Sequence, residues 1–575
     1  MEMTGSQILF ECMKREGVSV LFGYPGGAII DLFDELPKHR ELHHVLVRHE
    51  QAAVHAADGY ARASGKVGTV LVTSGPGATN TVTGIATAYC DSIPLVVFTG
   101  QVPTSLIGND AFQEVDIVGI TRPCTKHSFL VKDINKLAMT IRQAYYLARS
   151  GRPGPVLVDI PKDIQQARTE FVWPEEVFMR SYNPTYKPNL NQLRRTVEEL
   201  DVARRPIILA GGGVIMANAA EELTQLARMA RIPVACTLMG LGGFPDTDAL
   251  SLGMVGMHGT YAANLAVNNT DLLICVGARF DDRVTGKLSA FAPKARIVHI
   301  DIDPTSIRKN VEVDVPVVGD CKLALTGILE ICQQRFESRD WNSDHGEWLK
   351  TVLEWKTSQP LSYAKADGKH IKPQAVIEAL RHLTKGEAIV TTEVGQHQMW
   401  TAQFFSFTKP RTLLTSGGLG TMGYGFPAAI GAQMAFPDKL VLTIAGDGSI
   451  QMNIQELATA ISQRLPVKVI ILNNQHLGMV RQWQELFYNH NYSSVTMERE
   501  PDHVTNDDIQ PDFVMLAQAY GAEGYRIEKA EDLLPELEKA LASPLPAFID
   551  VRVEREENVY PMVPSGAALD EMLLV

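Results

Sequence analysis

The chain has 575 residues, of which 45% are hydrophobic and 21% charged, and its formal net charge is −13 at pH 7. This length predicts several domains with ample core, and the negative charge argues against nucleic acid or an anionic membrane as a partner. Because no membrane helix or signal pattern is recognisable, and the seven cysteines form no Cys-x-x-Cys pair, we expect a cytoplasmic protein with reduced thiols.

The first informative element is a short strand, Val45 to Arg48, that leads into a helix of small residues beginning at Glu50. A carboxylate at the start of a helix is by default a capping group that the helix dipole stabilises. A partly desolvated carboxylate with a raised pKa can instead serve as an acid–base catalyst. Both interpretations of Glu50 stay open on these residues alone.

Linkers divide the rest of the chain. Residues 171–190 are irregular and rich in proline, and the polar stretch 337–370 is expected to reach the last domain through a short helix. We therefore expect a first domain at 1–170, a middle domain at 191–336, a last domain at 371–553 and a tail at 554–575. Such a tail either covers a site or caps an end of the fold.

The middle domain contains signals of a nucleotide site. Pro206 to Ala210 is a predicted strand that runs into three glycines, Gly211 to Gly213, where the backbone can approach a ligand closely. Two further strands, Leu272 to Val276 and Ile297 to Asp303, end in glycine or charged residues. Three such strand ends suit a dinucleotide, although ordinary turns between strands and helices give the same pattern.

The last domain carries the most specific pattern. A predicted strand, Val441 to Ala445, is followed by Gly446-Asp447-Gly448-Ser449 and a helix, which places a phosphate at a helix N-terminus. The next strand delivers Asn474 to the same edge of the sheet. A carboxylate and an amide oxygen that share an octahedral shell with phosphate are typical of Mg²⁺. The pattern therefore predicts thiamine diphosphate held partly through Mg²⁺.

The chain also contains an internal repeat. Val70 to Gly77 has the pattern of Val441 to Gly448, with glycine at the same two places, and matching residues follow in the next helix and strand. An ordered set of matches predicts two related α/β domains. With the middle domain, we expect an α/β protein of three doubly wound parallel sheets. Only the later copy keeps the metal ligands.

Taken together, these motifs resemble the catalytic large subunit of acetohydroxyacid synthase, also called acetolactate synthase, over nearly the whole chain. The motifs that carry the resemblance are Phe22 to Ala28, Arg48 to Gln51, Ser74 to Gly77, Phe112 to Asp116, Arg279 to Gly286, Val394 to Trp400, Gly420 to Gly423, Gly446 to Ser449 with Asn474, and Gly478 to Trp483.

The resemblance implies a thiamine diphosphate-dependent enzyme that decarboxylates pyruvate and ligates the two-carbon unit to a second 2-keto acid. The second molecule is pyruvate or 2-ketobutyrate, the products are 2-acetolactate or 2-aceto-2-hydroxybutyrate, and the reaction begins branched-chain amino-acid biosynthesis. The implied cofactors are thiamine diphosphate, Mg²⁺ and FAD, with FAD structural because the net reaction transfers no electrons. The implied assembly is a homodimer or homotetramer with active sites between subunits and a separate small regulatory subunit.

The resemblance also assigns residues to roles. Those implied in catalysis are Glu50, Gly27, Gln113 and Met422, the last supporting the cofactor from beneath. Those implied to bind thiamine diphosphate are Glu50, Pro25, Gly26, Val394, Gly395, Gln396, His397, Met422, Gly446, Asp447, Gly448, Ser449 and Asn474. The implied metal ligands are Asp447, Asn474 and His476, the last through its backbone carbonyl.

Two further groups follow from the resemblance. Those implied to bind FAD are Arg152, Gly211, Gly212, Gly213, Thr237, Leu238, His258, Gly277, Arg279, Asp281, Arg283 and Asp320. Those implied to bind substrate are Arg283, which would pair with the acceptor carboxylate, and Trp483, Phe112, Met479 and Lys162. For Arg283 and Trp483 a surface cation and a core aromatic remain the structural alternatives.

Two other functions stay open at this point. One is a related thiamine enzyme, either a pyruvate oxidase with a redox-active FAD or a catabolic acetolactate synthase without FAD. The other is a non-catalytic subunit with a degenerate site, which the presence of Glu50, Asp447 and Asn474 disfavours.

Overall fold

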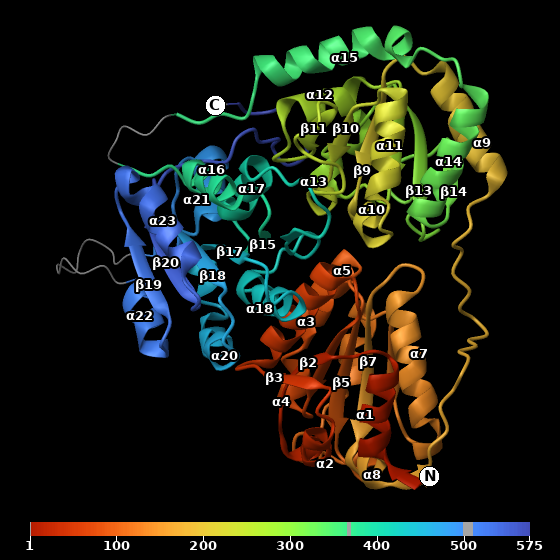
Figure 1. Ribbon diagram of the computed structural model, residues 1–575, viewed down its shortest axis with the longest axis vertical. Helices are drawn as coiled ribbons and strands as arrows, with labels where there is room; N and C mark the ends of the chain where they lie inside the picture. Colours follow the sequence, from red (N-terminus) through yellow and green to blue (C-terminus); the bar gives the residue numbers. More distant parts are fainter. Residues whose placement is uncertain (1, 365–369, 498–509, 575) are drawn as a thin grey trace.

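The computed structural model describes residues 2–364, 370–497 and 510–574 of the chain. Its framework is three six-stranded parallel sheets with helices packed around them. Figure 1 shows the first sheet at the bottom in red and orange, the middle sheet at the upper right and the third at the left in blue. The expected α/β class with three doubly wound sheets is therefore confirmed. Residues 498–509 of the expected last domain and Val575 of the tail lie outside the described part.

The first sheet has the strand order β3-β2-β4-β5-β7-β6. Its inner strands β4, β5 and β7 are buried at every position, as expected where helices cover both faces of a parallel sheet. The strands are β2 (Val20–Tyr24), β3 (His43–Leu46), β4 (Gly68–Val72), β5 (Leu95–Gln101), β6 (His127–Leu130) and β7 (Pro155–Pro161), and the α-helices are α1 (Gly5–Arg15), α2 (Ile30–Glu35), α3 (Glu50–Ser64), α4 (Pro76–Thr79), α5 (Val82–Asp91), α6 (Ile117–Thr121), α7 (Leu137–Arg149) and α8 (Lys162–Gln166). A separate antiparallel pair joins β1 (Glu2–Thr4) to β8 (Arg168–Glu170).

The third sheet has the order β16-β15-β17-β18-β20-β19, which repeats the arrangement of the first sheet strand for strand. Its strands are β15 (Ile389–Thr392), β16 (Leu413–Leu414), β17 (Val441–Gly446), β18 (Lys468–Asn473), β19 (Glu523–Ile527) and β20 (Ala547–Arg552), and its helices are α16 (Pro373–Thr384), α17 (Gln396–Phe404), α18 (Gly425–Ala435), α19 (Asp447–Ile450), α20 (Leu457–Ser462), α21 (Gly478–Phe487), α22 (Phe513–Tyr520) and α23 (Leu533–Ala542). The matched segments β4 and β17 occupy the same position in the two sheets. The predicted internal repeat is therefore a repeated topology.

The middle sheet has a different order, β11-β10-β9-β12-β13-β14. The chain moves outward from β9 in one direction and then from β12 in the other, so a switch point lies between these two strands, where ligands bind in such sheets. The strands are β9 (Pro206–Ala210), β10 (Val234–Cys236), β11 (Ser251–Met254), β12 (Leu272–Val276), β13 (Arg296–Asp301) and β14 (Val315–Val318), and the helices are α9 (Leu190–Val202), α10 (Gly212–Met216), α11 (Ala220–Ala230), α12 (Tyr261–Asn269), α13 (Asp282–Thr285) and α14 (Cys321–Arg335).

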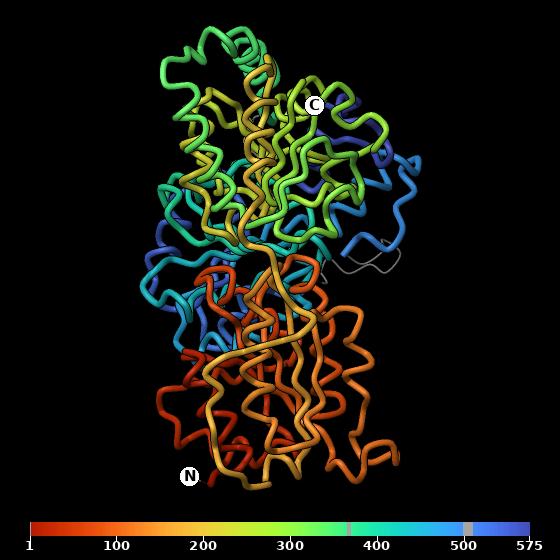
Figure 2. The backbone as a smooth tube through the Cα atoms, turned by 90° about the vertical axis from the view of Figure 1, so that its right-hand side faces the viewer, coloured from red at the N-terminus to blue at the C-terminus, as the bar shows by residue number. Residues whose placement is uncertain are grey.

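Two connections join the three sheets. Residues 171–189 contain no helix or strand and run along the outside of the molecule from the first sheet to the middle one, as Figure 2 shows in yellow. The second connection contains α15 (Trp341–Ser358), which has 18 residues and is longer than the short helix expected. It is ordered because Trp341, Trp348 and Val352 bury one face of it against the middle domain.

Helices α3 and α18 join the first and third domains by close packing. An added Cβ at Gly431 would lie 1.8 Å from the carbonyl oxygen of Ala56, and one at Gly59 would lie 2.1 Å from that of Ala428. Glycine at these two positions lets the helix backbones approach each other closely. This contact fixes the orientation of α3, whose first residue is Glu50.

The tail packs back onto the middle domain. Val563 and Leu569 are buried in a core cluster with the middle sheet, and the backbone N–H of Val563 donates to the carbonyl of Met257 at 2.8 Å. Nearer the third sheet, the side chain of Gln396 donates to the carbonyl of Glu557 at 2.9 Å. The tail therefore ties the third domain to the middle one and supports a residue of the predicted thiamine site.

Candidate functional site

A cavity of about 90 Å³ lies at the carboxyl ends of the neighbouring strands β15, β17 and β18. The loops that follow these strands form its walls together with Met422 from the loop after β16, so four separate segments meet there. The lining residues are Val394, Gly395, Gln396, His397, Trp400, Met422, Gly446, Asp447, Gly448, Ser449, Leu472, Asn474, His476, Leu477, Gly478, Met479 and Val480. The structure thus brings together all the third-domain residues predicted to hold thiamine diphosphate and the metal.

The walls of this cavity suit a diphosphate. Added Cβ atoms at Gly446 and Gly478 would lie 2.9 Å from Nδ1 of His397 and 2.1 Å from Oε1 of Gln396, so glycine is required for the loops to pass. Within the described residues, Oγ of Ser449 and Nε2 of His397 are buried without a hydrogen-bond partner. Burial also lowers the pKa of His397 to about 3, which keeps the ring neutral. These two atoms are therefore available to a bound ligand, ion or water.

The metal ligands expected here are all oxygens. Asp447 is 1% exposed, and burial raises the pKa of its carboxyl to about 6. Its Oδ2 accepts a hydrogen bond from Nε2 of Gln510, a residue that the sequence analysis did not single out. Oδ1 of Asn474 accepts from the backbone N–H of His476 at 3.1 Å. Within the described part of the chain, no three His, Cys, Asp or Glu side chains form a metal-binding group. One carboxylate with amide and carbonyl oxygens fits Mg²⁺ better than a transition metal.

The corresponding edge of the first sheet holds a second cluster, centred on Glu50. Oε2 of Glu50 accepts a hydrogen bond from Nδ2 of Asn80 at 2.9 Å. An added Cβ at Gly77 would lie 3.3 Å from Oε1 of Glu50 and 2.6 Å from Cγ2 of Thr73. Oγ1 of Thr73 is itself buried without a partner among the described residues. Glu50 therefore faces a tight polar recess between the loops that follow β3 and β4.

The other expected first-domain residues lie at the same edge. The ammonium group of Lys162 donates to the carbonyl of Gly27 at 3.2 Å. Gln113 has a positive φ of 59°, and its Cβ would lie 2.9 Å from a Cβ added at Gly75. The preceding Phe112 is 89% exposed. The phenyl ring of Phe112 is therefore open to solvent in the single chain.

Among the described residues, the third-domain cavity does not include the Glu50 cluster. All the described residues that line the third-domain cavity come from the third domain, and Glu50 is not among them. The domains nevertheless touch through side chains near both clusters. The carboxylate of Glu456 accepts from the backbone N–H of Arg48 at 2.9 Å, and the hydroxyl groups of Thr87 and Thr421 are 2.7 Å apart.

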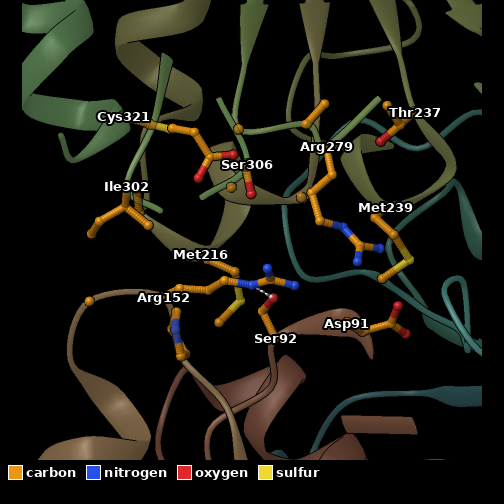
Figure 3. Close-up of a pocket in the computed structure, with 18 of the residues that line it drawn as sticks. Asp91, Ser92, Arg152, Met216, Thr237, Met239, Arg279, Ile302, Ser306 and Cys321 are labelled. Carbon is orange, nitrogen blue, oxygen red and sulfur yellow. Dashed lines mark hydrogen bonds between the residues drawn. The ribbon is translucent and has the colours of Figure 1, made fainter. Parts of the chain in front are cut away.

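A larger cavity of about 340 Å³, the middle cleft, lies between the first and middle domains (Figure 3). Its size is that of a typical ligand site. Arg152 crosses it: Nε donates to Oγ of Ser92 at 2.8 Å and Nη1 pairs with Asp303 at 3.1 Å. The lining residues are Cys90, Asp91, Ser92, Arg149, Gly151, Arg152, Pro153, Tyr186, Gly212, Gly213, Met216, Ala217, Thr237, Met239, Gly277, Ala278, Arg279, Phe280, Asp281, Val284, Asp301, Ile302, Ser306, Asp320 and Cys321.

The cleft lies at the switch point of the middle sheet, and its floor is built from glycine. A Cβ added at Gly213 would lie 2.6 Å from Cα of Gly277, and one at Gly211 would lie 2.3 Å from the carbonyl oxygen of Gly277. Side chains are therefore excluded where β9 and β12 end, and a flat ligand can reach the backbone. Arg149, Arg152 and Arg279 add positive charge. This combination fits a dinucleotide such as FAD.

Not every residue expected to bind FAD lines this cleft. Gly211 and Leu238 adjoin lining residues without being among them. His258 lies elsewhere, between the middle domain and the tail, with Nδ1 3.4 Å from the carbonyl oxygen of Pro561. Asp281 and Asp320 line the cleft and also cap the first turns of α13 and α14, so each has a structural role as well.

The residues expected to bind the acceptor do not lie together in one of the two cavities of the single chain. Met479 lines the third-domain cavity. Arg283 lies outside both cavities, with a side chain that is 57% exposed and 3.3 Å from Asp282. Trp483 is half-buried on α21 with its ring 6.0 Å from Phe487, and its Nε1 is buried without a partner among the described residues.

Two residues that the sequence analysis missed hold the site from behind. Glu393 is fully buried at the end of β15, where it accepts from the backbone N–H groups of Gly423 at 2.6 Å and Phe426 at 3.0 Å. It therefore holds the turn that contains Met422, and burial raises the pKa of its carboxyl to about 7. Glu456 likewise holds the backbone two residues before Glu50, because its carboxylate accepts from the N–H of Arg48. Neither had a local signal, because each acts on backbone distant in sequence.

Comparison with protein families identifies the class of protein that this fold and site define. Residues 3–120 match the N-terminal TPP binding domain of thiamine pyrophosphate enzymes, 193–328 match their central domain, and 393–551 match their C-terminal TPP binding domain. The three matches cover most of the chain. Within residues 2–364, 370–497 and 510–574, no helix has both the length and the apolar character needed to cross a bilayer.

Individual relatives narrow the family. The chain is 50% identical over 580 residues to the acetolactate synthase isozyme 3 large subunit of Escherichia coli K12, covering 100% of this chain and 99% of that protein. It is 50% identical over 577 residues to the acetolactate synthase large subunit of Parasynechococcus marenigrum, covering 99% and 91%. It is 48% identical over 571 residues to the chloroplastic acetolactate synthase 3 of Brassica napus, covering 99% and 86%. The chain therefore belongs to the acetolactate synthase large-subunit family.

Proposed function

We propose that the chain decarboxylates pyruvate and joins the two-carbon unit to a second pyruvate or to 2-ketobutyrate, giving 2-acetolactate or 2-aceto-2-hydroxybutyrate. This reaction is the first common step of branched-chain amino-acid biosynthesis. The observation that carries the proposal is the 50% identity to an acetolactate synthase over the full length of the chain. It is supported by a cavity that holds Asp447, Asn474 and Ser449 together, where the Ser449 hydroxyl has no partner among the described residues.

Thiamine diphosphate would lie with its diphosphate in the third-domain cavity. Gln396, His397, Gly448 and Ser449 would bind the phosphate oxygens, and Mg²⁺ would be held by Asp447, Asn474 and the backbone carbonyl of His476. When bound, the cofactor supplies the electron sink that decarboxylation requires. The apolar side chain of Met422, on the turn that Glu393 fixes, would support it from below.

Glu50 would move the proton that activates the cofactor. Its carboxylate lies at the start of α3 and is oriented by Asn80, so it could share a proton with a ring nitrogen of an aminopyrimidine placed in the recess beside Thr73 and Gly77. General acid–base groups of this kind contribute roughly 10²–10⁴ in rate. Pro25 and Gly26 would line the same recess. Gly27 and Gln113 would lie near the oxygen on which charge develops.

FAD would occupy the middle cleft as a structural cofactor. Two features of the cleft support this assignment: its floor is formed by Gly212, Gly213 and Gly277, and Arg152 and Arg279 provide positive charge. We propose that FAD is also contacted by Gly211, Thr237, Leu238, His258, Asp281, Arg283 and Asp320.

Substrate specificity would come from residues of all three domains. Arg283 would pair with the acceptor carboxylate, and Trp483 would pack against the extra methyl group of 2-ketobutyrate. Phe112, Lys162 and Met479 would complete the pocket. The exposure of Arg283 and Phe112 in a single chain supports a pocket that closes only in an assembly.

The assembly would be at least a homodimer, in which the Glu50 cluster of one chain faces the third-domain cavity of another. The separation of the two clusters within one chain supports this arrangement. Several relatives are called large subunits, and on that basis we propose that this chain also binds a small regulatory subunit.

The compartment and the domain limits are proposed as well. All seven cysteines are unpaired, which supports a reducing compartment such as the cytoplasm. The proposed domains are residues 1–170, 191–336 and 371–553, followed by a tail at 554–575.

One assay tests this function. The purified chain is supplied with thiamine diphosphate, Mg²⁺, FAD and pyruvate, and pyruvate loss, acetolactate formation and oxygen uptake are followed together. We expect one acetolactate for two pyruvates without oxygen uptake. Pyruvate loss with matching oxygen uptake would make the protein an oxidase instead, and no turnover with bound cofactors would make it a non-catalytic subunit.

A further inference from the structure

The loop that carries Met422 is held by a residue of another domain. This loop, residues 415–424, connects β16 to α18. The backbone N–H groups of Gly417 and Gly418 donate to the two carboxylate oxygens of Asp91, at 3.1 and 2.7 Å. Asp91 is the last residue of α5 in the first domain. The course of the loop towards Met422 therefore depends on the end of α5.

The same end of α5 forms a wall of the middle cleft. Cys90, Asp91 and Ser92 all line it, and Met239 of the middle domain lines it beside them. Figure 3 shows Asp91 and Met239 at one side of the cleft, where the backbone of the third domain passes. A Cβ added at Gly417 would lie 2.3 Å from Sδ of Met239. Two walls of the cleft thus grip neighbouring residues of the loop.

A buried ionic network makes this grip rigid. The Asp91 side chain is 0% exposed and pairs with Arg62 at 2.8 Å. Arg62 pairs in turn with Asp58, which accepts a hydrogen bond from the hydroxyl of Tyr424 at 2.7 Å. Breaking one member of such a network leaves a buried charge unpaired, which is strongly destabilising. Met422 therefore lies between two points of the loop, Gly418 and Tyr424, that the network fixes.

We propose that Asp91 is a positioning residue that couples ligand occupancy of the middle cleft to thiamine diphosphate binding through the Met422 loop. This proposal rests on the proposed function, in which the cleft holds FAD. A ligand that packs against Met239 and the end of α5 stabilises the arrangement in which the buried Asp91 carboxylate accepts from Gly417 and Gly418, and so fixes Met422 beneath the proposed thiamine site. FAD thereby contributes to a reaction that transfers no net electrons, by ordering a residue of the other cofactor site.

The test measures cofactor affinities of the full-length oligomer. After both cofactors are removed, thiamine diphosphate is titrated at fixed Mg²⁺ with and without saturating FAD, and FAD is titrated by flavin fluorescence with and without thiamine diphosphate. Coupling between two sites is reciprocal and typically 5–150-fold. We expect each cofactor to tighten the other by the same factor of at least about 5.

Three variants locate the coupling. Asp91→Asn removes one acceptor oxygen of the grip, and Met239→Ala removes the contact with Gly417. Both should bring the ratio of affinities close to one, whatever they do to FAD affinity itself. Ile302→Ala is the matched control, because Ile302 lines the cleft on the side away from the loop (Figure 3). It should weaken FAD binding and keep the ratio.

The outcomes separate this proposal from the function on which it rests. A wild-type ratio of one, or a ratio that survives in Met239→Ala and in folded Asp91→Asn, would overturn the coupling while acetolactate formation stands. If Asp91→Asn fails to fold, the ratio in Met239→Ala decides. If wild-type protein forms acetolactate without binding FAD, both the flavin assignment and the coupling are wrong.

Discussion

The carboxylate of Glu456, in the third domain, accepts a hydrogen bond from the backbone N–H of Arg48, in the first domain, at 2.9 Å. Arg48 is two residues before Glu50. Its side chain points back to the carbonyl of Leu46 at 2.7 Å, so the backbone group alone makes this contact between domains. The third domain thereby holds the backbone two residues before α3, as the first domain holds the loop that carries Met422. Each of the two sheet edges at which we propose that the cofactor binds is held by the domain that carries the other edge.

Glu50→Gln should slow the enzyme without unfolding it. The amide is nearly isosteric and can still accept from Asn80, but it cannot exchange a proton with the cofactor. We expect acetolactate formation to fall roughly 10²–10⁴-fold while thermal stability and thiamine diphosphate affinity change little. Glu175→Gln, at an exposed position of the first linker, is the matched control. A rate within a few-fold of wild type would return Glu50 to a capping role.

Asp447→Ala should raise the requirements for Mg²⁺ and thiamine diphosphate together, because the diphosphate is held partly through the ion. Titration of each cofactor at a fixed level of the other measures this, and we expect both half-saturation concentrations to rise at least about 10-fold. Asp438→Ala changes an exposed aspartate of the same domain and should change neither. An unaltered Mg²⁺ requirement in Asp447→Ala would show that the carboxylate is not a ligand.

Much of the fold could be predicted from the sequence because local patterns determine it. Pro206 to Ala210 and Leu272 to Val276 are strands β9 and β12 with the predicted limits. The glycine pattern at Gly75 and Gly446 predicted a repeat that the strand orders confirm. Local patterns also placed Gly446 to Ser449 at the carboxyl end of β17, since one strand and its following turn suffice for that.

Contacts between domains could not be predicted in the same way. Asp91 and Tyr186 line the middle cleft although neither belongs to the middle sheet, and nothing in their neighbourhood indicates a ligand. Glu393 and Glu456 are buried carboxylates whose partners are backbone groups distant in sequence. The length of α15 depends on a face that packs on the middle domain. These features arise from packing, which a single segment of sequence does not specify.

Glu456 should make stability depend on pH in a defined direction. Burial raises the pKa of its carboxyl from 4.5 to about 7, so the folded protein holds this proton more tightly than the unfolded chain does. This group therefore lowers stability as the pH rises from about 4.5 towards 7. Glu456→Gln removes the titration and keeps an acceptor for Arg48. We expect its Tm relative to wild type to rise across that window, by an amount equivalent to up to roughly 3 kcal/mol. A difference in Tm that is constant with pH would contradict this.

Gly431→Ala should disrupt the contact between the first and third domains. Its new methyl group would lie 1.8 Å from the carbonyl oxygen of Ala56, so α3 and α18 must move apart, at a cost of roughly 1–3 kcal/mol or more. A fall in Tm with weaker thiamine diphosphate binding is the expected result. Gly346→Ala is the control, because nothing lies within 4 Å of its Cβ in α15 and alanine favours a helix by about 0.5–1 kcal/mol. Equal effects of the two changes would argue against close packing.

The choice of acceptor tests the pocket that we assign to Arg283 and Trp483. Pyruvate and 2-ketobutyrate differ by one methylene, which a fitted apolar pocket distinguishes by about 1–3 kcal/mol, or roughly 10–200-fold. If Trp483 is the wall of that pocket, Trp483→Leu should bring the preference for 2-ketobutyrate towards one. Acetolactate formation from pyruvate alone should persist, because Arg283 still holds the carboxylate.

Arg283→Ala should instead weaken both acceptors together, since each presents the same carboxylate. The guanidinium is only loosely held by Asp282 in the single chain, so its loss should leave the fold intact. Both variants are measured by competition between the two keto acids at fixed concentrations, with the product ratio as the readout. Trp355→Leu, in α15 against Trp348, controls for the loss of an indole that is not part of the proposed pocket and should keep the wild-type ratio. The same ratio in Trp483→Leu would return Trp483 to the structural core.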